Sequence, residues 1–330
     1  MKLGIVGTGQ IAEEVMPQLG AWGWTAQVLC GTPRSEEKVR QLCAAHNIPL
    51  AYTDYSAMLK EADVDAIYIA VPNFLHYSLA KQALETGHHV ILEKPMTSHS
   101  RETETLSILA REKGLYLFEA ISTLHLPAYQ KIKEWLPRLG TIKLVSCNYS
   151  QYSSRYDAFR AGTVLPTFDP AKSGGALMDL NLYNLHYLIG LFGRPENVSY
   201  HANLDRGIDT SGALILNYST FQAVSLAAKD SNAPTVYTIQ GTDGYICLET
   251  PANRFNSAVL CLHNGTEERF QADYISRLEP EFRFFAREIV SGDRTKCYAQ
   301  LDHSVLVSRI LTEARLSAGI RFPSDDIEYK

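Results

Sequence analysis

Short apolar runs alternate with helical patterns along the first 120 residues of the chain. A run of aliphatic and β-branched residues that ends at Gly, Pro or a charge is typical of a strand buried in a parallel sheet, whereas apolar residues three or four positions apart indicate a helix. Six strands alternating with helices predict a doubly wound parallel sheet in an α/β fold. The predicted strands are Lys2–Val6, Ala26–Cys30, Pro49–Tyr52, Asp65–Val71, Val90–Leu92 and Leu115–Phe118.

The pattern changes after residue 120. Two glycine-containing turns, Gly241–Gly244 and His263–Thr266, lie between alternating runs and predict hairpins of an antiparallel sheet. Helices are expected over about 281–290 and 305–318. We therefore expect two domains, residues 1–120 and 121–330. Further strands of the second domain are expected at Ile142–Tyr149, Val198–Leu204, Gly212–Tyr218 and Ala223–Ala227.

Composition narrows the class of protein. The chain has 330 residues, of which 45% are hydrophobic and 20% charged, and a net charge of -5. These values are typical of a soluble globular protein and give no sign of a nucleic-acid or membrane partner. The amino terminus lacks a secretion-signal pattern, and no stretch approaches the roughly 20 apolar residues of a membrane span. The six cysteines have no zinc-site spacing, so we expect buried thiols, no metal and a cytoplasmic location.

A glycine-rich turn directly follows the first predicted strand. The segment Gly7–Ala12 has the G-x-G-x-x-G/A arrangement between a strand and a helix, the context in which this motif binds a dinucleotide. Gly7 permits the tight turn, Gly9 lets a pyrophosphate approach the backbone, and the helix amino terminus offers N–H groups to phosphates. The alternative is a plain strand-to-helix turn.

The segment after the second predicted strand bears on the choice of cofactor. An NAD-selective protein usually carries Asp or Glu about 20 residues past the glycines, to hold the ribose hydroxyls. Here Thr32, Arg34 and Ser35 occupy this segment instead, and a guanidinium suits a 2′-phosphate. We therefore expect NADP(H) to be favoured over NAD(H). The alternative is that Arg34 and Ser35 only begin the next helix.

The fifth predicted strand ends in a charged pair followed by a proline, Glu93-Lys94-Pro95. Open α/β sheets bind ligands at the carboxyl ends of their strands, so Lys94 is placed as a cation where a ligand is expected. The strand ends at Val71 and Leu92 should face the same crevice as the glycine turn. The alternative is a surface Glu–Lys pair at a strand end.

An apolar helix of the second domain carries three polar side chains on one stripe. Asp179, Tyr183 and His186 are spaced i, i+4 and i+7 and follow the pair Gly174-Gly175. A buried Asp among Leu and Met costs several kcal/mol unless it is hydrogen-bonded or paired. Helix spacing alone slightly favours a structural Asp, with Tyr and His at the edge of the core.

An irregular stretch rich in Ser, Tyr and Arg precedes this helix, from Gln151 to about Lys172. A loop of this length in a compact domain is more often functional than idle. Arg155 and Lys172 are candidates to line a polyol or phosphate pocket, with His186 a further substrate candidate, and full solvation of the two cations is the equal alternative.

Together, Gly7–Ala12, Val71-Pro72-Asn73 with His76, and Glu93-Lys94-Pro95 resemble the glucose–fructose oxidoreductase / inositol dehydrogenase / rhizopine-catabolism (Gfo/Idh/MocA) family. The resemblance implies a Rossmann domain and a carboxy-terminal α/β domain with an open, mostly antiparallel sheet, which pairs between subunits in a homodimer or homotetramer. It also implies cofactor contacts from the amino-terminal motifs. The expected cofactor-binding residues are Gly7, Thr8, Gly9, Gln10, Ile11, Thr32, Arg34, Val71, Pro72, Asn73, His76, Glu93 and Lys94.

The same resemblance implies catalytic roles for Lys94, Asp179 and Tyr183, and the tyrosine version is similar to the dihydrodiol and xylose dehydrogenase branch. Two positions depart from the family pattern. Asn181 replaces a frequent Gly, and Leu124 stands where many members carry an Arg, so a pocket cation is missing and the substrate stays open.

These residues predict an NAD(P)-dependent oxidoreductase that acts on a hydroxyl of a sugar, polyol or related alcohol. Tyr183 as phenolate is the candidate base, and Lys94 is the cation that favours this anion and contacts the developing alkoxide. Asp179 would orient Lys94 or the substrate. The alternatives are an NAD-retaining glycosidase of the same family and a dinucleotide-binding regulator without catalysis.

Overall fold

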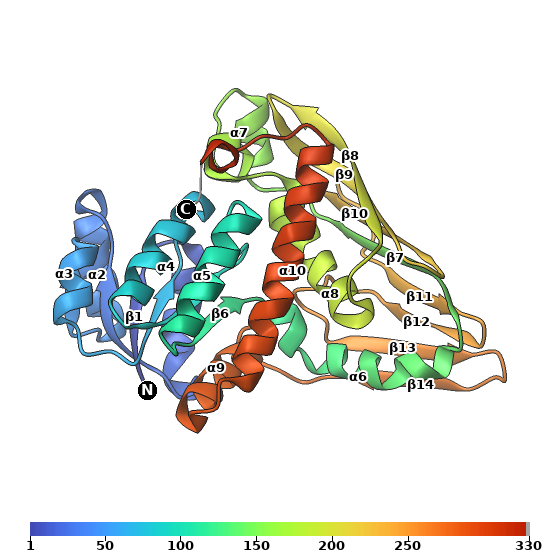
Figure 1. The fold of residues 1–330 in the computed structure, drawn as a ribbon, viewed down its shortest axis with the longest axis horizontal. Coiled ribbons are helices and arrows are strands. Elements are labelled where there is room, and N and C mark those ends of the chain that lie inside the picture. The colour runs from blue at the N-terminus through green and yellow to red at the C-terminus, as the bar shows by residue number, and fades with distance from the viewer. Residues whose placement is uncertain (328–330) are drawn as a thin grey trace. The chain divides into compact units, whose positions relative to one another are not determined.

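The computed structural model describes residues 1–327 (Figure 1). The chain forms two compact units, and it passes through the first of them twice. The first unit consists of Met1–Ala120 and Leu278–Val305, and the second of Ile121–Arg277 and the chain from Leu306 onward. The return of Leu278–Val305 is not part of the division into residues 1–120 and 121–330 predicted from the sequence.

The first unit contains the predicted parallel sheet. Its strand order is β3-β2-β1-β4-β5-β6, and all neighbouring strands run parallel. The order reverses between β1 and β4, and ligands of such sheets bind outside the carboxyl ends of the strands at this point. The strands are β1 (Lys2–Val6), β2 (Thr25–Cys30), β3 (Leu50–Tyr52), β4 (Ala66–Ile69), β5 (His89–Glu93) and β6 (Leu117–Ala120).

Helices cover both faces of this sheet, and the returning segment supplies α9 and the first part of α10. Phe282 and Phe285 of α9 are fully buried against strand residues, with the ring of Phe285 centred 4.7 Å from that of Phe118. The indole of Trp24 donates to the Phe282 carbonyl at 2.9 Å. This packing explains why α9 belongs to the first unit. The helices are α1 (Gln10–Val15), α2 (Glu36–His46), α3 (Tyr55–Glu61), α4 (His76–Glu85), α5 (Ser100–Glu112), α9 (Glu279–Ser291) and the first part of α10 (Thr295–Ser317).

The second unit is built on an eight-stranded sheet of order β14-β13-β12-β11-β7-β10-β9-β8. β7 and β10 pair parallel and the other neighbours pair antiparallel, which confirms the mostly antiparallel sheet and both predicted hairpins. α6 (Pro127–Trp135) and α8 (Leu182–Phe192) lie on one face (Figure 1). The strands are β7 (Ile142–Ser150), β8 (Asn197–Asp205), β9 (Ile208–Asn217), β10 (Gln222–Ala228), β11 (Tyr237–Gly241), β12 (Gly244–Leu248), β13 (Ser257–Leu262) and β14 (Glu267–Gln271).

The predicted irregular stretch of the second unit contains short helical turns. α7 (Tyr156–Arg160) and 3-10 turns at Pro166–Phe168 and Pro170–Lys172 interrupt it. The rings of Phe159 and Phe168 are fully buried and stack at 4.8 Å. These aromatics anchor a segment whose sequence shows no regular period.

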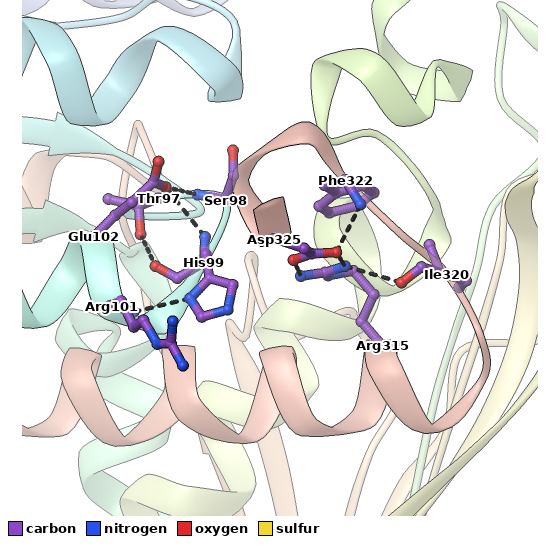
Figure 2. Close-up of polar contacts among 9 residues, drawn as sticks. All are labelled: Thr97, Ser98, His99, Arg101, Glu102, Arg315, Ile320, Phe322 and Asp325. Carbon is purple, nitrogen blue, oxygen red and sulfur yellow. Dashed lines mark hydrogen bonds and ion pairs between the residues drawn. The ribbon is translucent and has the colours of Figure 1, made fainter. Parts of the chain in front are cut away.

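A buried ion pair fastens the end of the described chain (Figure 2). The guanidinium of Arg315 donates to both carboxylate oxygens of Asp325, at 2.7 and 2.5 Å, and to the Ile320 carbonyl at 2.9 Å. The two-point contact satisfies charges that would be costly to bury alone. Within residues 1–327, no helix has both the length and the hydropathy of a membrane span.

Candidate functional site

The glycine turn after β1 has the geometry of a dinucleotide cradle. Gly7 has φ +116°, and a Cβ there would lie 2.1 Å from the Ala70 carbonyl oxygen, so only glycine fits. A Cβ on Gly9 would meet no atom within 4 Å, which leaves open space beside the backbone where α1 begins. No side chain caps this helix. The turn therefore has room for the phosphates of a dinucleotide, and their contact with these residues stays a prediction.

The segment after β4 lies beside this turn and is fixed by His76. Val71 and Asn73 are half-buried, but His76 is completely buried. Its Nδ1 lies 2.8 Å from the Pro95 carbonyl and its Nε2 2.9 Å from the Val71 carbonyl. The pKa of His76 is lowered, because the effect of burial is larger than that of the hydrogen bonds to these carbonyls, which raise it. In this structure the ring therefore ties two loops together and is not exposed to a cofactor.

The turn after β2 presents an exposed cation. Thr32 and Ser35 close the turn on each other, with the Thr32 N–H donating to the Ser35 hydroxyl at 2.8 Å and that hydroxyl donating back to the Thr32 carbonyl at 3.0 Å. Arg34 is exposed between them and has no ion-pair partner among residues 1–327. The turn does begin a helical segment, and it also leaves the guanidinium at the carboxyl edge of the sheet.

Lys94 directly follows β5 at the same edge and is half-buried. The preceding Glu93 is buried, and the Tyr68 hydroxyl donates to its Oε1 at 2.5 Å. Its other oxygen lies 3.3 Å from the Lys94 N–H, and the Lys94–Pro95 peptide bond is cis. Glu93 is thus enclosed by protein groups, and its role in the structure is to hold the strand end that carries Lys94.

Buried carboxylates fix the loop after Lys94, and Figure 2 shows one of them, Glu102, with its contacts to Ser98 and His99. Glu119 on β6 accepts from the Met96 N–H at 2.9 Å. Glu102 on α5 accepts from the Ser98 and His99 N–H groups at 3.0 and 3.2 Å. The loop backbone is therefore bound from two neighbouring elements, and Lys94 stands on a rigid support.

The helix that carries Asp179 and Tyr183 begins with a π-helical turn, Leu177–Asn181, and continues as α8. A Cβ on Gly175, which has φ +105°, would lie 2.0 Å from Asp209 Oδ1, so the turn needs glycine here. Asp209 Oδ2 accepts from the Leu177 N–H at 2.6 Å and from the Tyr200 hydroxyl at 2.7 Å. Burial raises the pKa of Asp209 to about 6. Single π turns inside helices are frequent at functional sites.

Asp179 forms an ion pair within its own unit. Its Oδ2 accepts from the Lys229 ammonium, which also donates to the Thr167 hydroxyl. The Lys229 side chain is 3% exposed, whereas that of Asp179 is 37% exposed. Asp179 is therefore a paired carboxylate that still reaches the surface of the second unit.

The other polar residues of this helix differ in accessibility. Tyr183 is 6% exposed, and its ring centre lies 6.2 Å from that of Tyr149. His186 is completely buried, so in this structure its ring is not accessible to a substrate. Asn181 is also buried and donates to the Ser225 carbonyl at 3.3 Å. It joins the π turn to β10, which gives a structural reason for Asn at a position where the family often has Gly.

The two predicted substrate cations of the preceding stretch differ in exposure. Arg155 is exposed directly before α7, whereas Lys172, at the end of a 3-10 turn, is half-buried. Their contact with a substrate remains a prediction. Within the described residues, no three His, Cys, Asp or Glu side chains gather in a way that would hold a metal ion.

Sequence reasoning missed Lys229, Glu119 and Asp209. The local sequence signal for Lys229 is a charged residue directly after Ala227-Ala228, at the end of a strand of small and apolar residues. The signal for Glu119 is likewise a charged residue, a carboxylate inside the buried strand β6. Asp209 lies in a strand, and its partner Leu177 is 32 positions away, so no local pattern reports the contact.

Comparisons with known proteins cover nearly the whole chain. Residues 1–121 match the family described as "Oxidoreductase family, NAD-binding Rossmann fold", and residues 129–247 match "GFO/IDH/MocA C-terminal domain". The scyllo-inositol 2-dehydrogenase (NADP(+)) IolU of Bacillus subtilis (strain 168) is 34% identical over 330 residues, which span 98% of this chain and 99% of that protein. The trans-1,2-dihydrobenzene-1,2-diol dehydrogenase of Xenopus tropicalis is 26% identical over 338 residues, with 98% and 99% covered.

The fold is shared with a solved structure of low sequence identity. The crystal structure of KijD10, a 3-ketoreductase from Actinomadura kijaniata in complex with NADP and TDP-benzene, superposes with a TM-score of 0.83. It is 20% identical, and the match covers 96% of this chain and 97% of that one. This likeness concerns the fold.

Proposed function

The chain belongs to the Gfo/Idh/MocA family of NAD(P)-dependent oxidoreductases, and from this premise we propose that it transfers hydride between NADP(H) and the carbinol or carbonyl carbon of a sugar or polyol. The observation that carries the proposal is the edge of the first sheet, where the open glycine turn and the rigidly held Lys94 both stand at carboxyl strand ends. The relative from Bacillus subtilis, similar over nearly the full length, supports a polyol as the substrate and NADP(+) as the oxidant.

The residues of the first unit fit the cofactor. Gly7, Gly9 and the start of α1 would hold the pyrophosphate, and Arg34 would pair with the 2′-phosphate. When bound, NADP(H) supplies or accepts the hydride. Every other step of the reaction concerns the proton of the substrate hydroxyl.

Lys94 and Tyr183 are proposed to handle this proton. The Lys94 ammonium donates a hydrogen bond to the substrate oxygen, which gains negative charge as Tyr183, acting as phenolate, accepts its proton. A fixed support for Lys94 matters because misplacement of a catalytic group by 1 Å can cost about 10²-fold in rate. The clamped loop after β5 provides this support.

We also propose that the enzyme works in the cytoplasm as a homodimer or homotetramer joined through the second sheet. Three exposed apolar side chains lie on the same face of this sheet, those of Leu144, Leu226 and Tyr245. Leu144 and Tyr245 both pair with Gln240, and Leu226 lies four residues after Gln222, which also pairs with Leu144. Apolar side chains on a sheet face favour burial against another surface. Sedimentation of the purified protein as a monomer would contradict this part of the proposal.

The test is an absorbance assay of nicotinamide reduction with the purified protein. Scyllo-inositol, other inositols, D-xylose and trans-diols are each offered with NADP(+) and, separately, with NAD(+). We expect net formation of NADPH with at least one polyol, and a lower KM for NADP(+) than for NAD(+). Absence of net reduction across the panel would refute the oxidoreductase proposal, whereas a lower KM for NAD(+) would refute only the cofactor preference.

A further inference from the structure

The ion pair between Lys229 and Asp179 joins three segments of the second unit. Lys229 follows β10, Thr167 lies in the 3-10 turn Pro166–Phe168, and Asp179 lies in the π turn. The Lys229 ammonium donates to Asp179 and to Thr167, and it lies 5.1 Å from the centre of the Phe168 ring. The two donated bonds and the aromatic face surround the ammonium with groups that attract a cation.

A buried ammonium is costly unless its charge is compensated. The Lys229 side chain is 3% exposed, and removal of its charge partner would leave an uncompensated cation in the protein. Asp179, by contrast, is 37% exposed and has access to water. The desolvation cost of the pair therefore comes mainly from the Lys229 ammonium. A gain in folding stability alone does not explain why a lysine is buried there.

Backbone hydrogen bonds fix all three partners. The Lys229 N–H donates to the Thr210 carbonyl at 2.8 Å, the Gly175 N–H to the Thr167 carbonyl at 3.0 Å, and the Asp179 N–H to the Gly175 carbonyl at 3.2 Å. A Cβ on Gly174 would lie 2.7 Å from the carbonyl oxygen of Thr167, so the glycine pair allows the helix start to approach this turn. The carboxylate of Asp179 is thus held in one place before any substrate arrives.

We propose that Lys229 is a positioning residue of the reaction. It pairs with Asp179 and holds Oδ2 toward Thr167, so that the carboxylate serves as a fixed hydrogen-bond acceptor for a substrate hydroxyl. The inference rests on the proposed function, and it assigns Asp179 to the substrate, where the sequence left a choice between Lys94 and the substrate. Without Lys229 the carboxylate loses both its charge partner and its fixed orientation.

A double-mutant cycle tests this inference. Scyllo-inositol oxidation by NADP(+) is measured for the wild type, Lys229→Met, Asp179→Asn and the double variant. Met has a similar length and no charge, and the remaining Asp179 stays hydrated in this variant. We expect Lys229→Met to lower kcat/KM about 10- to 100-fold, mainly through KM, as for the loss of a hydrogen bond to a charged group. Because Lys229 acts through Asp179, the double variant should be no worse than Asp179→Asn alone.

Two further variants serve as controls. Lys131→Met removes an exposed ion pair with Glu134 in the same unit and should leave kcat/KM unchanged. Lys229→Arg keeps the charge and should recover part of the lost activity. Multiplicative losses in the double variant, or a Lys229→Met enzyme with the KM of the wild type, would overturn the positioning role.

Urea unfolding of the same four proteins separates this result from a failure of the proposed function. Absence of turnover in the wild type would refute the proposed function and, with it, the role in positioning a substrate contact. Coupling between Lys229 and Asp179 in the unfolding free energies would then show an ion pair that serves folding only.

Discussion

The loop after β5 and the turn before α8 both present a candidate catalytic side chain on irregular backbone, but they are held in different ways. In the first unit, Glu102 and Glu119 bind main-chain N–H groups of the loop, and Lys94 is placed by its backbone. In the second unit, Lys229 pairs directly with the carboxylate of Asp179, while Asp209 binds the backbone at Leu177. A side chain can therefore be placed either by hydrogen bonds to its backbone or by an ion pair with its own charge.

The largest expected effect concerns the side chain that follows the π turn. Tyr183→Phe keeps the ring that packs near Tyr149 and removes only the hydroxyl, so the fold should be retained. Loss of the proton acceptor should lower kcat about 10²- to 10⁴-fold, measured in the NADPH assay. Tyr187→Phe is the matched control, because the hydroxyl of this buried tyrosine has no hydrogen-bond partner in the described chain. Equal rates for the two variants would remove Tyr183 from the mechanism.

A smaller effect, on the pH dependence of stability, is expected from Asp209, whose carboxylate binds the start of the same helix. Burial raises the folded-state pKa of Asp209 from 3.8 to about 6. Protonation of the Asp209 carboxyl therefore stabilises the folded state, fully below about pH 4. This contribution to the unfolding free energy is lost as the pH rises through 6. Relative to Asp209→Asn, the wild type should lose about 2 kcal/mol of unfolding free energy between pH 4 and pH 7. Urea unfolding at both pH values checks this, and parallel pH profiles would contradict the raised pKa.

The smallest effect on stability is expected in the loop after β5, where a carboxylate binds backbone N–H groups. Glu102→Gln replaces a charged acceptor of the Ser98 and His99 N–H groups by a neutral one of the same shape. The unfolding free energy should fall by about 1–2 kcal/mol, measured by urea unfolding. Glu112→Gln, on the exposed face of the same helix, should change it little. A larger loss of unfolding free energy in Glu112→Gln than in Glu102→Gln would show that the Glu102 carboxylate does not stabilise the loop.

Local patterns were sufficient to predict the parallel sheet and the hairpins. β1 was predicted with its bounds, because the run Lys2–Val6 ends at a glycine that strand geometry cannot continue. Leu278–Val305 could not be assigned to the first unit, since Phe282 contacts Trp24 across 258 positions. Contacts of this kind depend on the folded chain and leave no period in the sequence.

The candidate site was predicted by residue type more readily than by environment. The glycine turn, Lys94 and Asp179 all stand at the positions that their motifs suggest. His76 belongs to a motif as well, but its ring lies between two backbone carbonyls, and the burial that decides this is not visible in the motif. The same limit applies to Lys229, whose partner lies 50 positions away.

We propose that Lys94 serves the chemical step while the glycine turn binds the cofactor. The most direct measurement compares Lys94→Ala with the wild type in two assays, NADPH binding by fluorescence and NADP(+) reduction by scyllo-inositol. Turnover by the Lys94→Ala enzyme should be lowered by about 10²-fold or more, with its NADPH affinity changed by only a few fold. A Lys94→Ala enzyme with the turnover of the wild type, or one that no longer binds NADPH, would contradict it.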